Sequence, residues 1–562
     1  MMMRTVLIPT VATILALGAA PAALAQAGLT SIGPRIIDRN RIDQSPSTVA
    51  PPSGQVAGGG KRAPAAPPPG VEDQSFVLRD VAVEGATAIQ ADRLRRVWAG
   101  RQGQTARVRD VYAMADAIGQ LYADSGYALY SVSVPSQDFR SGHVRIRVTE
   151  GYVASVTISG NTEGADLSVL KAQAARIVGE RPLLQATLER NILLMNEIAG
   201  LKVGSQFEPI PGQPGAVTLK LAIKRTTFEY GIDFDNQGNA LLSRTQMAAN
   251  VAVNSLLREG DRTQLVVGAP LSIERYQYYG LSHTEPIGTD GAKVTVNLGD
   301  LVTNPVHHED GGSAQFFDLS ASYPLIRAVR ESLTATGSFD GLNSNDALLG
   351  RTLADERTRV LRAGLSWAKQ DNALDALTGV SALSVSVSEG LDAFGARQES
   401  LVYGGPRFTK LNARASRSQD LPWNFVVRAK LAIQYAFDHL PATEQFAFGG
   451  TEFGQAYDTA AVTSDSAAAT SLEVAYKLPQ SWFPSVLTSN EVFGFGDYAR
   501  LWNREAPLMR AHDRGASAGF GVRTKLLDKL SLEAGVANAV LPPESLTRAE
   551  RWRALLQVSG KF

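Results

Sequence analysis

The chain has 562 residues, with 55 Lys and Arg against 55 Asp and Glu and no cysteine. This length exceeds one ordinary domain, and the zero net charge gives no general field that would attract nucleic acid. The lack of cysteine excludes disulfides and thiolate chemistry, and no run of about twenty apolar residues follows the first thirty positions, which excludes a helical membrane protein.

Residues 1–25 have the three parts of a secretory signal peptide. Arg4 gives the positive start, an apolar core runs from Val6 to Ala19, and Ala23-Leu24-Ala25 is a small-x-small cleavage site. This pattern predicts Gln26 as the first mature residue. An N-terminal membrane anchor is the alternative, and the shortness of the apolar core disfavours it.

A short amphipathic segment and a linker follow. In residues 26–45 isoleucines are interspersed with Arg and Asp, which predicts a helix beginning near Pro34. Residues 46–72 are rich in Pro, Gly, Ala and Ser, which predicts an extended, mobile linker. A tethered helix of this kind could plug a pore, while a disordered exported tail is the alternative that the residues leave open.

Two similar units, residues 75–151 and 152–225, both predict the order β-α-α-β-β. In the first, strands are expected at 76–83, 128–134 and 143–149, and helices at 91–98 and 108–125. In the second, strands are expected at 154–159, 201–208 and 216–223, and helices at 166–178 and 185–199. Each unit must bury its helices on one face of a three-stranded sheet, which leaves a strand edge available for pairing.

Residues 226–562 predict an all-β transmembrane barrel of about sixteen strands. Phe228, Tyr230, Ile232 and Phe234 alternate with polar residues or glycine, and this two-residue period recurs along the region. Long polar links are expected at 236–243, 302–314, 341–356, 389–405, 446–466, 500–513 and 538–551, with short ones such as 324–330, 417–423 and 526–527 between them. Long outer loops and short periplasmic turns are typical of outer-membrane barrels.

The last strand and the positions of the tryptophans are typical of a barrel that lies in the outer membrane. The chain ends on Phe562, on the same strand face as Leu556 and Val558, which resembles the signal read by the outer-membrane assembly machinery. Five of six tryptophans lie in the barrel region, several near expected strand ends, as an interfacial girdle requires. They are Trp367, Trp423, Trp482, Trp502 and Trp552.

Motifs in the first unit carry a resemblance to a known family. Gly126-Tyr127, Pro135-Ser136-Gln137-Asp138 and the segment from Val144 to Gly151 are similar to the first POTRA domain of two-partner secretion transporters, the TpsB family of the BamA-like superfamily. Two such units ahead of a barrel also match that family in order. The resemblance implies that Gly126, Tyr127, Pro135, Gln137 and Gly151 serve recognition of a secreted exoprotein, usually a haemolysin or an adhesin.

The same resemblance extends to the link 446–466. Here Gly449-Gly450 and then Gln455-Ala456-Tyr457 resemble the family's outer loop that folds into the lumen, whose tip reads Arg-Gly-aromatic. The family Arg pairs with an Asp of a Phe-x-Asp strand, for which Phe495-Gly496-Asp497 is the counterpart. Because Gln455 cannot make a bidentate ion pair, the lock is expected to be weaker or to use another cation. An ordinary Gly-rich outer loop is the alternative.

The sequence contains no motif that favours an enzyme or a metal site over a transporter. His307-His308-Glu309-Asp310 falls in a long polar link and is expected to be solvated rather than to hold a metal, and no nucleophile elbow, P-loop or zinc-protease motif occurs. We therefore expect no enzyme and no cofactor. The resemblance implies an outer-membrane pore whose POTRA domains, in the periplasm, bind an unfolded exoprotein by adding it to a strand edge. A BamA- or TamA-like insertase is the alternative, and an outer-membrane enzyme or passive porin is a third.

Overall fold

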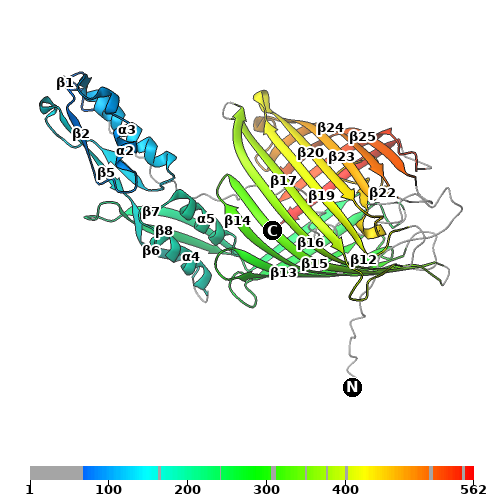
Figure 1. Cartoon of the computed structure of the whole chain (residues 1–562). Helices are drawn as coiled ribbons and strands as arrows, with labels where there is room; N and C mark the ends of the chain where they lie inside the picture. The colour runs from blue at the N-terminus through cyan, green and yellow to red at the C-terminus, as the bar shows by residue number, and fades with distance from the viewer. Residues whose placement is uncertain are drawn as a thin grey trace.

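The computed structural model describes residues 67–162, 166–238, 240, 242–304, 312–348, 351–374, 377–398, 403–504, 510–546 and 551–562. Two small α+β units lie to one side of a closed barrel, which the second unit adjoins (Figure 1). The expected signal peptide, the expected plug helix and the motif His307 to Asp310 lie outside the described residues.

The first unit has a sheet of order β2-β5-β4, covered by α3. Its elements are β1 (Ser75–Val77), β2 (Asp80–Glu84), α2 (Ala91–Arg95), β3 (Thr105–Arg107), α3 (Val108–Asp124), β4 (Tyr130–Ser133) and β5 (His143–Glu150). The single strand predicted over 76–83 is wrong, because the chain turns at Leu78 and Arg79, so β1 pairs with β3 while β2 joins β5. The helix predicted over 91–98 ends at Arg95.

The second unit repeats the plan with a sheet of order β6-β8-β7. Its elements are β6 (Tyr152–Gly160), α4 (Ser168–Val178), α5 (Gln185–Asn196), β7 (Leu201–Pro209) and β8 (Ala216–Arg225). Leu170, Ile177, Leu188 and Ile192 of the helices are fully buried against the sheet. Only Gly151 separates β5 from β6, and only two residues separate β8 from the barrel.

Sixteen antiparallel strands close the barrel, with β27 pairing back onto β9. They are β9 (Phe228–Asp235), β10 (Gln246–Asn254), β11 (Arg262–Ala269), β12 (Tyr276–Ile287), β13 (Ala292–Thr303), β14 (Gly312–Arg327), β15 (Glu331–Leu348), β16 (Arg351–Leu374), β17 (Leu377–Gly390), β19 (Phe408–Asp420), β20 (Phe425–Ala436), β23 (Ser466–Lys477), β24 (Leu487–Trp502), β25 (His512–Leu526), β26 (Leu530–Leu541) and β27 (Trp552–Lys561). The short strand β18 (Arg397–Gln398) adds to β16.

The alternation of side chains separates a lipid face from a lumen face. On β9, Phe228, Tyr230 and Ile232 are about half exposed on the outside, while Glu229 accepts a hydrogen bond from Asn254 Nδ2 of β10 on the inside. In a bilayer the apolar face meets lipid, and closure leaves no unpaired strand edge.

The long link predicted over 341–356 is wrong. There β15 and β16 run on as paired strands from Gly341 opposite Arg359 to Leu348 opposite Arg351. The error has a physical reason: the sequence here runs through consecutive polar residues, Asn343 to Asp346 and Asp355 to Arg359, so it lacks the alternation by which strands are found in a sequence. A link at 270–275, between β11 and β12, was not anticipated.

Candidate functional site

The link between β20 and β23, residues 437–465, folds back against the inner wall of the barrel. It contains a short hairpin of β21 (Phe446–Phe448) and β22 (Val462–Ser464). Most of its apolar side chains from Phe446 to Val462 are almost fully buried and form one cluster with wall residues that include those of β24 and β27. The main members are Phe446, Phe448, Phe453 and Tyr457 of the loop and Phe493, Phe495, Leu501 and Leu555 of the wall. Residues 437–465 are called the in-turned loop below.

Two glycines allow the tight path of the in-turned loop. Gly449 and Gly450 have φ of +115° and +99°, which side-chain-bearing residues rarely adopt. A Cβ at Gly449 would also clash with the carbonyl oxygen of Asp458, and one at Gly515 of β25 would clash with the ring of Phe448. The backbone of the loop and the wall beside it therefore fit only because these positions lack side chains.

The tip of the loop meets the wall at Asp497 of β24, but through its backbone. The Gln455 backbone N–H donates to Asp497 Oδ2 at 3.3 Å, and Ser517 Oγ donates to the same oxygen at 2.9 Å. Asp497 is 3% exposed, and within the described residues its Oδ1 has no hydrogen-bond partner. Ala456 is buried in the cluster next to Tyr457. The structure thus brings together the residues named from the resemblance, without a side-chain lock from Gln455.

Tyr457 fixes the tip to the two neighbouring strands. Its hydroxyl lies 2.9 Å from the carbonyl oxygens of both Ala516 and Leu541 and donates to them in turn. Its ring packs on Phe448 with a centroid separation of 5.5 Å. The aromatic position of the motif therefore anchors the loop to β25 and β26.

Ion pairs that sequence reasoning missed hold the in-turned loop on the opposite wall. Glu452 lies 2.5 Å from Arg414 Nη1 of β19. Glu444 lies 2.8 Å from both Arg362 of β16 and Lys410 of β19, and all three side chains are almost completely buried. In these pairs the loop supplies the carboxylates and the wall supplies the cations, which reverses the charges of the family's Arg–Asp lock; Arg362 also pairs with Asp340 of β15 at 2.7 Å.

The recognition residues expected near the end of α3 lie at the junction of the two units. The Gln185 N–H donates to the Gly126 carbonyl at 2.7 Å, and Tyr127 forms an isolated bridge with Leu184. The Gly151 carbonyl accepts from the Leu183 N–H at 3.1 Å. These contacts join the units to one another, a role that the resemblance did not suggest.

Pro135 and Gln137 shape one side of β5. Pro135 has no N–H, so β4 stops short of it and leaves the backbone of Arg145 unpaired on that side. The Gln137 side chain replaces a strand there, since Nε2 donates to the Arg145 carbonyl at 2.8 Å and Oε1 accepts from the Arg145 N–H at 2.7 Å. Both residues therefore close part of this sheet instead of leaving it open.

Glu150 ties the end of β5 to the turn before α2. Its carboxylate accepts from the backbone N–H groups of Thr87 and Ala88 at 2.8 and 2.7 Å and from the Tyr122 hydroxyl at 2.6 Å. Burial raises the pKa of Glu150, but these hydrogen bonds and one from the Thr87 hydroxyl outweigh it and hold the pKa below its ordinary value. The same contact and burial raise the pKa of Tyr122.

The second unit is docked on periplasmic turns of the barrel. Arg176 and Arg190 of its helices lie 3.2 and 3.3 Å from Asp290, in the turn between β12 and β13. Glu197 lies 2.6 Å from Arg327 at the end of β14. Glu259 Oε2, in the turn between β10 and β11, accepts from the Val169 N–H at 3.2 Å, and burial raises the pKa of this carboxyl. The unit is therefore held by ion pairs and hydrogen bonds to three turns.

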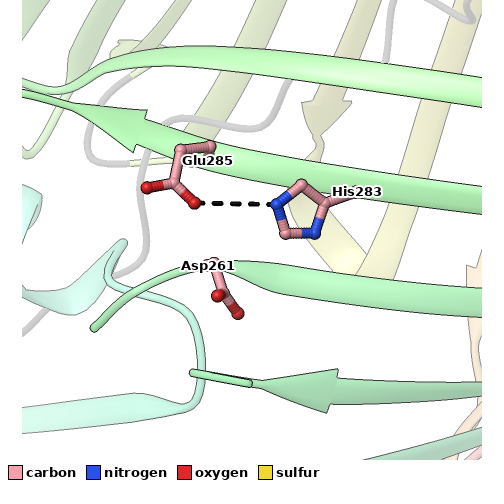
Figure 2. Close-up of side chains that lie close together, drawn as sticks. All are labelled: Asp261, His283 and Glu285. Carbon is pink, nitrogen blue, oxygen red and sulfur yellow. Dashed lines mark ion pairs between the residues drawn. The ribbon is translucent and has the colours of Figure 1, made fainter. Parts of the chain in front are cut away.

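Three side chains near that interface have the composition of a metal site. Asp261, His283 and Glu285 lie close together, and His283 Nε2 is 3.6 Å from Glu285 (Figure 2). However, the Asp261 carboxylate accepts three backbone N–H groups of its own turn, from Leu256, Leu257 and Arg258, at 2.6–2.8 Å. Its geometry is that of a turn cap, so we assign the cluster a structural role.

Phe562 takes part in closing the barrel. Its backbone N–H and carbonyl exchange hydrogen bonds with Tyr230 of β9, at 2.9 and 3.0 Å, and its ring is 55% exposed. Among the helices that the structure describes, none is both long and apolar enough to cross a bilayer.

Family models match both parts of the chain. The model described as haemolysin secretion/activation protein ShlB/FhaC/HecB matches residues 216–524, and the model of the ShlB-type POTRA domain matches residues 76–151. Among curated proteins, the heme/hemopexin transporter protein HuxB of Haemophilus influenzae is 22% identical over 456 residues, which cover 77% of this chain and 78% of HuxB. The outer membrane transporter CdiB of Dickeya dadantii is 21% identical over 195 residues, 34% of each chain.

Solved structures show the same fold. CdiB from Escherichia coli superposes with a TM-score of 0.68 and 18% identity, covering 94% of this chain and 95% of CdiB. BamA from Haemophilus ducreyi lacking POTRA domains 1–3 gives a TM-score of 0.51 and 14% identity, covering 86% of this chain and 100% of that structure.

Proposed function

The chain belongs to the haemolysin secretion/activation family ShlB/FhaC/HecB. We propose that its POTRA units capture the exoprotein and that its in-turned loop gates the pore. As a member of the family it is a two-partner secretion transporter of the outer membrane, not an enzyme, and it secretes an exoprotein through its barrel. The observation that carries the proposal is the burial of the loop against the inner wall, since a loop in that position obstructs the path.

Capture takes place at the outer edge of β4. In the described part of the chain this strand pairs with β5 alone, so the backbone groups of Tyr130 to Ser133 on the other side are open to an added strand. Backbone pairing demands little sequence specificity, which suits a long unfolded cargo. Gln137 closes the neighbouring part of β5 and so confines pairing to β4.

Gating follows from the contacts of the loop. Its acidic residues Glu444 and Glu452 hold it on β16 and β19, and Tyr457 holds the tip on β25 and β26. An arriving segment must displace some of these contacts before it passes. No nucleotide is needed, because folding of the exoprotein outside removes the unfolded chain from the transport equilibrium.

Three further assignments are part of the proposal and rest on the sequence. Residues 1–25 direct export, residues 26–45 plug the resting pore, and Phe562 is read by the outer-membrane assembly machinery. The exposed ring of Phe562 and its place on the last strand support the last of these.

Tethering the loop tests the gate. The chain has no cysteine, so Glu452→Cys with Arg414→Cys can be joined by a bis-maleimide with a reducible spacer. Secretion of the exoprotein is expected to stop in the tethered protein and to return when the spacer is cleaved, whereas each single variant treated alike continues to secrete. Undiminished secretion with the loop tethered would overturn the gate.

A further inference from the structure

The barrel closes along a short seam. The register of β27 with β9 comprises five pairs, from Gln557 opposite Asp235 to Lys561 opposite Gly231, while β9 and β10 share eight. Towards the outer end, beyond the paired residues, Asn236 donates its backbone N–H to the Leu556 carbonyl at 3.1 Å and its Nδ2 to the Ala554 carbonyl at 3.0 Å. Fewer backbone pairs therefore hold β27 to β9 than hold β9 to β10.

Arg553 reaches across the seam from β27. Its Nη2 donates to the carbonyl oxygens of Gly238 at 2.9 Å and Asn236 at 3.3 Å, in the segment that follows β9. The side chain is only 5% exposed, so its guanidinium needs a nearby countercharge.

Asp458 of the in-turned loop supplies that countercharge. Its Oδ1 lies 2.9 Å from Arg553 Nη1, and its Oδ2 accepts the Ala240 N–H at 3.0 Å. Arg244 Nε lies 3.7 Å from the same carboxylate. The next residue, Thr459, donates its N–H to the Gly238 carbonyl at 3.4 Å. One short segment of the loop thus touches both sides of the seam.

We propose that Asp458 is a positioning residue that clamps the β9–β27 seam through Arg553, so that withdrawal of the in-turned loop also loosens the wall of the barrel. When the loop withdraws, the buried guanidinium loses its countercharge and turns towards water, and its hydrogen bonds to Gly238 and Asn236 break. Coupling is reciprocal, so a loosened seam also favours release of the loop. This goes beyond gating of the lumen, although it uses the same placement of the loop.

Hydrogen exchange of the full mature chain in lipid nanodiscs, without exoprotein, tests the clamp. Asp458→Asn keeps the size of the side chain and removes its charge. We expect exchange in residues 228–236 and 552–562 to become about tenfold faster, because leaving a buried guanidinium without its countercharge shifts the population ratio by at least this order. Residues 331–348 of β15 are expected to exchange as in the wild type.

Two further variants separate a clamp from general loosening. Glu533→Gln removes an ion pair with Arg523 on the wall beside β27, at 2.7 Å, and does not touch the loop, so seam exchange is expected to stay at the wild-type rate. In an Arg553→Gln background, which already lacks the clamp, Asp458→Asn is expected to add little further acceleration. Wild-type exchange at the seam in Asp458→Asn, or equal acceleration in β15, would overturn the clamp. Since no exoprotein is present, this result is independent of whether the gate itself is correct.

Discussion

Glu452 of the in-turned loop lies 2.5 Å from Arg414 of β19, so the loop carries the negative partner of its lock and the wall carries the positive one. Glu444, with Arg362 and Lys410, has the same polarity. In the family that the sequence resembles, an Arg of the loop faces the Asp, and because Gln455 stands at that position we expected a weaker lock or one that uses another cation. Gln455 instead approaches Asp497 with its backbone N–H alone. The ion pairs of Glu444 and Glu452 thus retain the loop on β16 and β19, in addition to the contacts of Tyr457 with β25 and β26.

Neutralising the lock is expected to open the pore. Glu452→Gln removes the ion pair, while Arg414 stays on a wall where it is only 7% exposed. The loss of a charge-assisted hydrogen bond shifts the equilibrium of the loop by about tenfold towards the displaced form. In planar bilayers the variant should spend correspondingly more time at high conductance than the wild type.

The charge swap is the control for this prediction. Glu452→Arg with Arg414→Glu recreates the pair with reversed charges and should return the conductance towards that of the wild type. If the double variant conducts like Glu452→Gln, or if Glu452→Gln conducts like the wild type, the pair does not retain the loop.

Installing the family's cation should strengthen the closed state. Asp497 is 3% exposed, and its Oδ1 has no partner in the described part of the chain. An Arg at position 455 lies where its backbone N–H already reaches this carboxylate, so Gln455→Arg should form an ion pair with it and make open events about tenfold rarer. The same substitution made together with Asp497→Asn should have no such effect. More frequent openings in Gln455→Arg alone would show that the site rejects the longer side chain.

The sequence predicts the barrel strands well where one face of the strand is apolar and the other is polar. On β9 the alternation of Phe228, Tyr230 and Ile232 with polar residues survives in the structure as an outer and an inner face. The paired ends of β15 and β16 escape prediction because their sequence runs through consecutive polar residues and has no two-residue period.

The loop lock escapes prediction for a different reason. Glu452 and Arg414 are 38 residues apart, and Glu444 and Arg362 are 82 apart, so only closure of the barrel brings them together. The motif around Gln455 named Asp497 as its partner, and in the structure the contact between them is made by the Gln455 backbone N–H. A motif therefore indicates which segments lie close together, whereas the ion pairs that hold the loop depend on the tertiary structure.

The first POTRA unit should lose stability in acid through Glu150. Its folded pKa is held below the ordinary value, so the carboxylate contributes stability above the unfolded pKa and loses it as the pH falls through the folded pKa. Hydrogen exchange of the Thr87 and Ala88 amides, corrected for the intrinsic effect of pH, should therefore accelerate below about pH 4. Glu150→Gln should weaken these contacts by about 1 kcal/mol and remove the pH dependence. A wild-type protein whose exchange does not change with pH would contradict this assignment.

The segment of residues 26–45 is expected to act as a plug that is separate from the in-turned loop. Its isoleucines alternate with charged residues, and the linker of residues 46–72 gives it the reach to enter and leave the lumen. In planar bilayers the mature protein should show a low, flickering conductance, and a variant lacking residues 26–45 a larger and steadier one, which the in-turned loop still limits. Deleting the same number of residues within the linker serves as the control and should preserve flickering if the tether still spans the distance. Equal conductance in the full and the truncated proteins would remove the plug and leave the in-turned loop, held by Glu444 and Glu452, as the element that occludes the pore.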